Sequence, residues 1–404
     1  MKIMVYGCGV IGSFLVHKLC EAGNDVTVAA RGKWKDVLQN NGLQVRHKLS
    51  GKVTLDHPKV VETVPENKPY DIVFSVMQGQ QQEQLIPELA KINTPLVVLV
   101  GNNLYAAQME KDLLSLSENK KKVLFGFQGT AGVRHADSVT CISLGSGSMT
   151  VGGLHQVPDI DSKIALSSAF GDTGYQLEWM DDMEGWLYCH AAFILPIVYL
   201  SYRLNCDLTK ASREDIADVL SAAEEGYKLI DHAGMQIRPK GDEMFFNNDA
   251  KKSAVKLFLY IIAKTSLGRL CATDHCRNAV SEMEWIDEQF EQLKQKNPDY
   301  RMMVWDELRR RMGDWAVIHQ TYDRERGTFA LEKPEDNTLL SKEIAAGAAL
   351  GTCALLTVGV AASKKASKNG SRLGKVFSGI LFAGGVGVGI YSAYRAARKF
   401  FGTR

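Results

Sequence analysis

The feature that most constrains the fold is a glycine-rich turn within the first twelve residues. A short apolar run, residues 2–6, leads into Gly7-Cys8-Gly9-Val10-Ile11-Gly12, and a helical stripe of apolar residues follows. This G-x-G-x-x-G spacing is typical of a strand that turns into a helix whose N-terminus binds a pyrophosphate. The first glycine permits the tight turn, the second lets the backbone approach the phosphates, and the third lets the helix pack against the sheet. We therefore expect all six residues of this glycine loop (residues 7–12) to contact a dinucleotide.

The residues after the second predicted strand, 25–30, indicate which dinucleotide is bound. An NAD site usually places a carboxylate there, which accepts a hydrogen bond from the ribose 2′-hydroxyl. This chain has Arg31 and Lys33 instead, and no carboxylate follows the strand until Asp36. A planar guanidinium suits a 2′-phosphate, and a lysine adds a second positive charge. We expect NADP(H), held by Arg31 and Lys33; the alternative is that Arg31 is a solvated loop residue.

Apolar runs along the next part of the chain predict an α/β domain over residues 1–180. Segments that can form crossover helices, such as 84–92, separate runs at 70–77, 95–100 and 122–127. Strands that alternate with helices favour a doubly wound, mostly parallel sheet. We expect later strands, where this sheet closes, at 141–144, 149–153 and 175–179.

The pattern changes to helical at about residue 183, which predicts an all-helical second domain over 183–325. Its helices are expected at 186–200, 212–232, 254–270, 278–295 and 302–315. Ser212, with Asp215 three residues later, fits an N-terminal helix cap. We expect this domain to bind substrate and to form a homodimer. A polar linker over 326–343 and a hydrophobic tail over 344–404 complete the chain of 404 residues.

The cysteines and the start of the chain indicate a reducing compartment. The eight cysteines are scattered without C-x-x-C spacing and lack partner ligands for zinc, so we expect reduced thiols and no metal. The chain enters its first strand directly after Met1, which leaves no room for a signal peptide. We therefore expect the body of the protein to be cytoplasmic.

Six short motifs, taken in order over roughly residues 1–300, carry a resemblance to a known family. They are the glycine loop, Ala30-Arg31-Gly32, Val100-Gly101-Asn102-Asn103, Glu184-Gly185-Trp186-Leu187, His275-Cys276-Arg277-Asn278 and Ser281-Glu282-Met283. In this order they resemble the ketopantoate reductase (2-dehydropantoate 2-reductase) family. The resemblance implies an N-terminal α/β Rossmann domain, a helical C-terminal domain and NADPH-dependent reduction of a 2-oxo acid in the cleft between them.

The resemblance also implies roles for individual residues, and two of them depart from the family. The family has a lysine as general acid where this chain has Tyr188, and a second lysine, which contacts cofactor and substrate, where this chain has Gln78. Asn102 is retained and is expected to orient the nicotinamide ribose or the substrate, with Asn103 beside it at the cofactor. We expect Gln78 to contact the cofactor.

A polar set near the end of the resemblance is expected to bind substrate. Glu282 stands where the family has a carboxylate near substrate and cofactor. His275, Asn278 and Glu282 lie near helical spacing, so they can share one helix face. The alternative is an ordinary solvated helix face.

Tyr188 can replace a lysine as proton donor, because a phenol has an ordinary pKa near ~10 and a lysine ammonium one near ~10.4. The alternative interpretation is a core aromatic residue, since Leu187, Ala191 and Phe193 make the surrounding helix apolar. We expect Tyr188 and Asn102 to be the catalytic pair, acting on a small-molecule carbonyl substrate.

The tail over 344–404 combines apolar segments with positive charge. It has nine Lys or Arg residues and no acid, whereas the preceding 343 residues carry 39 basic and 46 acidic side chains. Residues 344–363 and 376–394 contain no charge, and each meets the roughly 17–25 residues needed to span hydrocarbon. We expect a hydrophobic helical hairpin that associates with a lipid membrane, with the number of spans open. The alternative is a buried, glycine-rich hairpin or an oligomerisation element.

Two functional hypotheses remain open at this point. One is a membrane-tethered, NADPH-dependent reductase; the other is a catalytically impaired NADP(H)-binding sensor or scaffold. The intact glycine loop favours both, the replaced lysines favour the second, and Asn102, Glu282 and Tyr188 favour the first. Nucleic-acid binding is not expected, because the basic residues lie beside apolar segments and are not interleaved with aromatic ones on a folded face.

Overall fold

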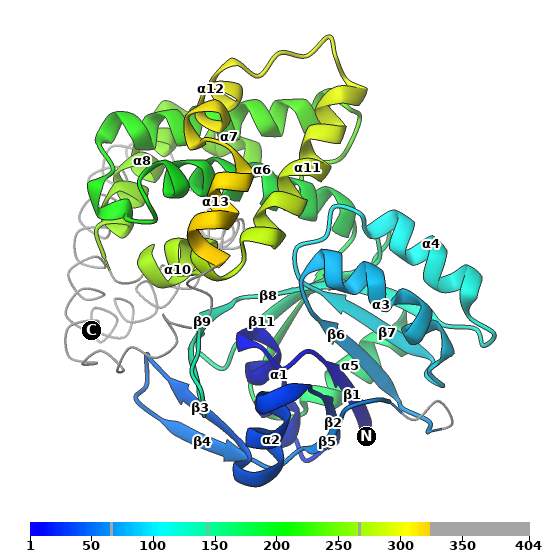
Figure 1. Ribbon diagram of the computed structural model, residues 1–404. Helices are drawn as coiled ribbons and strands as arrows, with labels where there is room; N and C mark the ends of the chain where they lie inside the picture. Colours follow the sequence, from blue (N-terminus) through cyan, green and yellow to red (C-terminus); the bar gives the residue numbers. More distant parts are fainter. Residues whose placement is uncertain (65–67, 144, 266–267, 324–404) are drawn as a thin grey trace, which may run out of the picture. The chain divides into compact units, whose positions relative to one another are not determined.

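The computed structural model describes residues 1–64, 68–143, 145–265 and 268–323 (Figure 1). The chain divides into two units, one from Met1 to Leu187 and one that begins at Tyr188. The division falls within helix α6 (Met183–Arg203). The linker and tail predicted over 326–404 lie outside the described residues.

The first unit contains the doubly wound, mostly parallel sheet that the sequence predicts. Its parallel strands, in spatial order, are β5 (Lys59–Val61), β2 (Asp25–Ala29), β1 (Lys2–Tyr6), β6 (Ile72–Val76), β7 (Leu96–Val100) and β8 (Lys122–Gln128). β11 (Ser148–Gly152) pairs antiparallel with β8, and β12 (Gln176–Met180) pairs parallel with β11. The helices of this unit are α1 (Val10–Glu21), α2 (Gly32–Asn41), α3 (Gly79–Lys91), α4 (Ala106–Leu116) and α5 (Ile160–Phe170).

The central strands are buried along nearly their whole length. All five residues of β6 and of β7 are buried, as are four of the five in β1. Strands covered on both faces need continuous apolar runs instead of an alternating pattern, which is why these strands are visible in the sequence. Their side chains join those of α1 and α5 in the core of this unit.

A second, four-stranded sheet packs against α1 and corrects one prediction. Its order is β4 (Val53–Asp56), β3 (Leu43–His47), β10 (Val139–Ser143) and β9 (Thr130–Arg134). The strand expected at 141–144 in the main sheet is β10, which belongs to this small sheet. Figure 1 shows β3 and β4 beside α2, in a sheet separate from the main one.

The second unit is helical, as predicted. After α6 come α7 (Arg213–His232), α8 (Asp249–Ala263), α10 (Asp274–Asn278), α11 (Val280–Lys296), α12 (Met303–Met312) and α13 (Trp315–Tyr322). Ser212 and Asp215 form the expected capping box at the start of α7. Gly226 of α7 lets α6 come close, because a Cβ there would lie 2.9 Å from the Cβ of Ala192.

Helix α6 is long and apolar enough to cross a membrane, judged by length and composition. It is the one such helix in the described part of the chain, and 83% of its apolar window is buried within the fold. Trp186 and Tyr199, near its two ends, are almost completely buried. These contacts make α6 a core helix.

A buried carboxylate connects four helices of the second unit. Asp287 of α11 is fully buried and accepts hydrogen bonds from Tyr199 Oη (2.6 Å), Trp315 Nε1 (2.9 Å) and Arg309 Nη2 (2.8 Å). Arg309 Nε also donates to both carboxylate oxygens at 3.0 Å. Every lone pair of the buried charge therefore faces a donor from α6, α12 or α13.

We expect Asp287→Ala to lower the free energy of unfolding by about 3–5 kcal/mol, because it leaves the Arg309 charge without its buried partner. Urea unfolding followed by circular dichroism measures this change. The matched control is Glu307→Ala on α12, which removes a surface carboxylate paired with Arg310 and Arg311 and should cost far less, because solvent screens surface ion pairs. Equal losses in the two variants would contradict the assigned role of Asp287.

Candidate cofactor and active site

The glycine loop lies where the strand order of the main sheet reverses. From β1 the chain runs outward to β2 and β5 on one side, and β6, β7 and β8 follow on the other. In open α/β sheets, ligands bind at such a switch point, outside the carboxyl ends of the strands. The loop leaves the carboxyl end of β1 and lies at this point.

The backbone of the loop requires glycine at two of its three glycine positions. Gly7 has φ +87°, and a Cβ there would lie 2.3 Å from the Val76 carbonyl oxygen. A Cβ on Gly12 would lie only 1.9 Å from the carbonyl oxygen of Gly7, so α1 packs directly on the turn before it. Apart from the adjoining residues of its own chain segment, no described residue comes within 4 Å of the place of a Gly9 Cβ. That open side allows a ligand to approach the backbone.

The N-terminus of α1 fits an anion. Gly9 caps the helix without a side-chain hydrogen bond, and the first turn contains no acid. The first backbone N–H groups of a helix have no partner within it, and the helix dipole places partial positive charge there. A phosphate group suits this position.

Residues far along the chain hold the loop in place. The Cys8 carbonyl accepts hydrogen bonds from Trp34 Nε1 (2.8 Å) and Ser13 Oγ (3.3 Å). Gln128 Nε2 donates to the Ile11 carbonyl (2.9 Å), and the Tyr175 hydroxyl donates to Gln128 Oε1 (2.9 Å). Neither Trp34 nor Gln128 is predicted from the sequence, because contacts over 26 and 117 residues leave no local pattern.

Arg31 and Lys33 lie where the sequence places them, directly after β2, the strand beside β1. Arg31 is the N-cap of α2, and both side chains are exposed. Among the described residues, no carboxylate forms an ion pair with Arg31 or Lys33. Both charges are therefore available to an anion.

The residues predicted after β6 and β7 also reach the carboxyl edge of the sheet. Gln78 caps α3, and its Oε1 accepts a hydrogen bond from Gln80 Nε2 (2.9 Å). Asn102 follows Gly101, whose N–H donates to the Gly126 carbonyl (3.0 Å). The structure thus brings the glycine loop, Gln78 and Asn102 to the ends of neighbouring strands.

Asn103 is placed differently from Asn102. It is buried, its Oδ1 accepts a hydrogen bond from the Tyr105 N–H (3.0 Å), and its Nδ2 lies 3.2 Å from Met109 Sδ. Its side chain supports the first turn of α4.

Gln82, which is not predicted from the sequence, is fully buried. Its Nε2 donates hydrogen bonds to the carbonyls of Ser75 and Val100 and so connects the ends of β6 and β7.

The predicted substrate residues of the second unit do not lie on one continuous helix. α10 ends at Asn278, the backbone breaks at Ala279 (φ −135°, ψ 38°), and α11 begins at Val280. His275 and Glu282 still meet across this break, with Nε2 and a carboxylate oxygen 3.4 Å apart. Asn278 bonds back to the Asp274 carbonyl of its own helix (2.7 Å). The expected shared face is therefore replaced by one polar pair.

The charge of that pair depends on two opposing effects. Desolvation disfavours the charged imidazole, but the Glu282 carboxylate outweighs it and raises the pKa of His275.

Tyr188 lies on α6 in the same unit, half-buried, with its ring centroid 6.4 Å from that of Phe290. The described residues contain no cluster of three or more side chains arranged to hold a metal ion.

These observations define a Rossmann α/β domain with a glycine loop at its switch point, joined to an all-helical unit. Residues 3–156 match the family model for ketopantoate reductase PanE/ApbA. Over these residues the chain is similar to ketopantoate reductases.

Solved structures share the fold over most of the described chain. A PanE/ApbA family ketopantoate reductase from Ralstonia eutropha is 15% identical, with a TM-score of 0.61 over 80% of this chain and 99% of that one. 2-Dehydropantoate 2-reductase from Geobacter metallireducens is 16% identical, with a TM-score of 0.58 over 80% of this chain and 100% of that one. D-mandelate dehydrogenase, in a ternary structure with NADH and anilino(oxo)acetate, is 16% identical, with a TM-score of 0.60 over 80% of this chain and 99% of that one.

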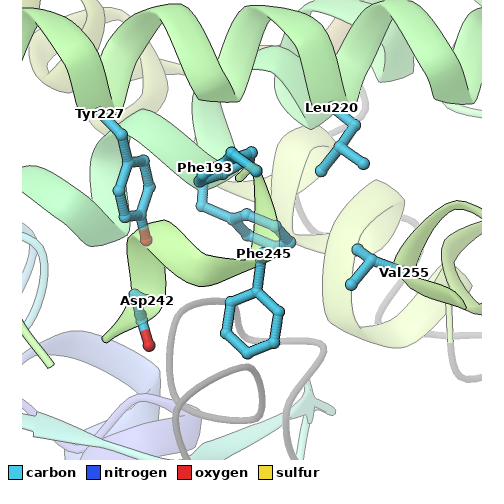
Figure 2. A pocket seen from close by; sticks show the side chains of 7 residues that line it. Phe193, Leu220, Tyr227, Asp242, Phe245 and Val255 are labelled. Atoms are coloured by element: carbon cyan, nitrogen blue, oxygen red, sulfur yellow. The ribbon is translucent and has the colours of Figure 1, made fainter. Parts of the chain in front are cut away.

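The second unit also contains a small internal cavity, separate from the residues discussed so far (Figure 2). Its volume of about 10 Å³ gives room for one water molecule. Aromatic and aliphatic side chains line it, and Asp242 is its one charged residue. Asp242 is 3% exposed, and its Oδ2 has no hydrogen-bond partner among the described residues.

The pKa of Asp242 is raised from 3.8 to about 7, mainly by burial and then by the charge of Glu243, while a hydrogen bond with Tyr227 opposes the shift. Between these two values the folded protein keeps the proton and the unfolded chain releases it. Wild-type stability should therefore fall as the pH rises through this interval and level off above about 7.

We expect Asp242→Asn to remove the pH-dependent loss of stability that Asp242 causes, so that the variant gains stability relative to wild type as the pH rises. Melting temperatures of both proteins across the interval measure the effect. Asp249→Asn, which replaces an exposed carboxylate at the start of α8, is the control and should keep the wild-type pH dependence. A pH profile of Asp242→Asn parallel to that of wild type would show that Asp242 is ionised in the folded protein.

Proposed function

We propose that this protein is an NADP(H)-dependent oxidoreductase that reduces a 2-oxo acid or a related carbonyl compound. The observation that carries the proposal is the glycine loop, with its open side at Gly9 and a helix N-terminus without a side-chain cap at the switch point of the sheet. The ketopantoate reductase match over residues 3–156 supports the reaction class. D-mandelate dehydrogenase, which shares the fold, binds NADH.

The choice of NADP(H) over NAD(H) rests on Arg31 and Lys33. Both follow the strand next to the glycine loop, which is where the ribose of a bound dinucleotide lies. Two cations without a carboxylate partner in the described chain favour a 2′-phosphate over a 2′-hydroxyl.

The side chains of this protein then have distinct tasks around the cofactor, which supplies a hydride when bound. The Tyr188 phenol gives its proton to the carbonyl oxygen as negative charge develops there. The Asn102 amide orients the nicotinamide ribose or the substrate from the end of β7. His275 and Glu282 form a polar pair for the substrate, and Gln78 contacts the cofactor from the end of β6.

Turnover of NADPH tests this assignment. The absorbance of NADPH is followed with purified full-length protein and a panel of 2-oxo acids. Tyr188→Phe should lower kcat by at least about a hundredfold without changing NADPH affinity, because it removes a general acid and keeps the ring. Tyr260→Phe on α8 is the matched control and should leave kcat unchanged. Wild-type kcat in Tyr188→Phe would exclude Tyr188 as the acid.

The second candidate function is a sensor or scaffold that binds NADP(H) without catalysis. Gln78 and Tyr188 favour it, since both replace lysines of the family that this chain resembles. Binding of NADPH without turnover on any compound of the panel would support this candidate.

We also propose that the tail over 344–404 holds a cytoplasmic catalytic body at a membrane. Its two uncharged segments and its nine basic residues support this, because each basic residue near an anionic leaflet adds roughly 1 kcal/mol of attraction. On fractionation, the full chain should sediment with membranes, and a version ending at Asn337 should stay in the supernatant. If both stay in the supernatant without detergent, the tail is not a membrane element.

A further inference from the structure

A third cation, Arg134, lies near the glycine loop and comes from the small sheet. Arg134 is the last residue of β9, and its guanidinium carbon lies 5.4 Å from the centroid of the Trp34 ring. Trp34 belongs to the first turn of α2 and donates its indole hydrogen bond to the Cys8 carbonyl (2.8 Å). One indole ring therefore links Arg134 to the middle of the glycine loop.

The charge of Arg134 is available to a ligand. The side chain is exposed, and no carboxylate of the described residues forms an ion pair with it. Its field reaches the loop: burial raises the pKa of the Cys8 thiol to about 11, and the Arg134 charge acts in the opposite direction. An arginine stacked on an aromatic ring keeps its N–H groups free at the edge of the guanidinium, where they can bind an oxyanion.

The position of Arg134 points to one phosphate group of the cofactor. The backbone amides of α1 already suit the pyrophosphate. Trp34, which holds Arg134, follows Arg31 and Lys33 in α2, at the end of β2 where the ribose lies. A phosphate dianion at this place is best matched by two guanidinium groups, each of which can donate two parallel hydrogen bonds.

We propose that Arg134, together with Arg31, binds the 2′-phosphate of NADP(H) and that Trp34 holds its guanidinium in place. The small sheet then takes part in cofactor selection through β9. This inference rests on the proposed function, since it presumes a dinucleotide at the glycine loop.

Dissociation constants for NADPH and NADH test the proposal on the full-length protein. Arg134→Gln should weaken NADPH binding by at least about tenfold, because it removes a charge-assisted hydrogen bond. Its NADH affinity should stay within about twofold of wild type. Arg134→Lys keeps the charge but loses the planar fork, so its NADPH affinity should lie between those of wild type and Arg134→Gln.

Arg213→Gln is the matched control, because Arg213 lies over the Tyr260 ring at a similar distance, 5.6 Å, in the other unit. It should change neither affinity. Melting temperatures of all variants show whether a loss of binding reflects a loss of folding.

The outcomes separate this inference from the proposed function. Unchanged NADPH affinity in Arg134→Gln overturns the inference alone, and so does an equal loss for NADPH and NADH, which would assign the guanidinium to the pyrophosphate. Wild-type protein that binds neither dinucleotide overturns the proposed function as well. Binding of adenosine 2′-monophosphate over adenosine 5′-monophosphate by wild type, lost in Arg134→Gln, would support the inference without any contribution from the nicotinamide.

Discussion

The contact between α1 and the turn before it is the constraint on which the candidate site depends. Gly12 lies so close to the Gly7 carbonyl that any side chain there would force the helix away from the sheet. This contact points the first amides of α1 at the carboxyl edge of the sheet. Trp34 and Gln128 then fix the carbonyls of Cys8 and Ile11, so the loop is held from α2 and from β8 at once. A loop held in this way is ordered before a ligand arrives, which lowers the entropic cost of binding.

Much of the framework of the site is visible in the sequence, because it depends on local chemistry. Buried parallel strands such as β6 and β7 need continuous apolar runs, and the capping box of α7 needs only Ser212 and Asp215. The small sheet was largely missed, since β4 is a short edge strand with alternating exposure and β9 is half-buried. The pairing that joins its two halves, β10 with β3, brings together residues about a hundred positions apart, such as Val139 with Val45, and no sequence periodicity indicates it.

The same limit applies to the individual side chains of the site. Glycine positions and the cations after β2 follow from motif spacing. Trp34, Gln82 and Gln128 act through long-range hydrogen bonds to backbone carbonyls, and an isolated tryptophan or glutamine in a sequence has no signature of that task. The break at Ala279 likewise occurs without a proline or glycine that would predict it. Because of this break, Asn278 bonds to a carbonyl of its own helix, while His275 and Glu282 contact each other.

Hydrogen exchange of the backbone amides tests the central claim, that the glycine loop binds a nicotinamide dinucleotide, most directly. The amides at the start of α1 have no helical acceptor, so they should exchange readily in the free protein. Addition of NADPH to the full-length protein should slow exchange in the segment 7–13 and, with it, in the segment 31–34. Unchanged exchange in both segments at saturating NADPH, or protection confined to the helical unit, would contradict this account.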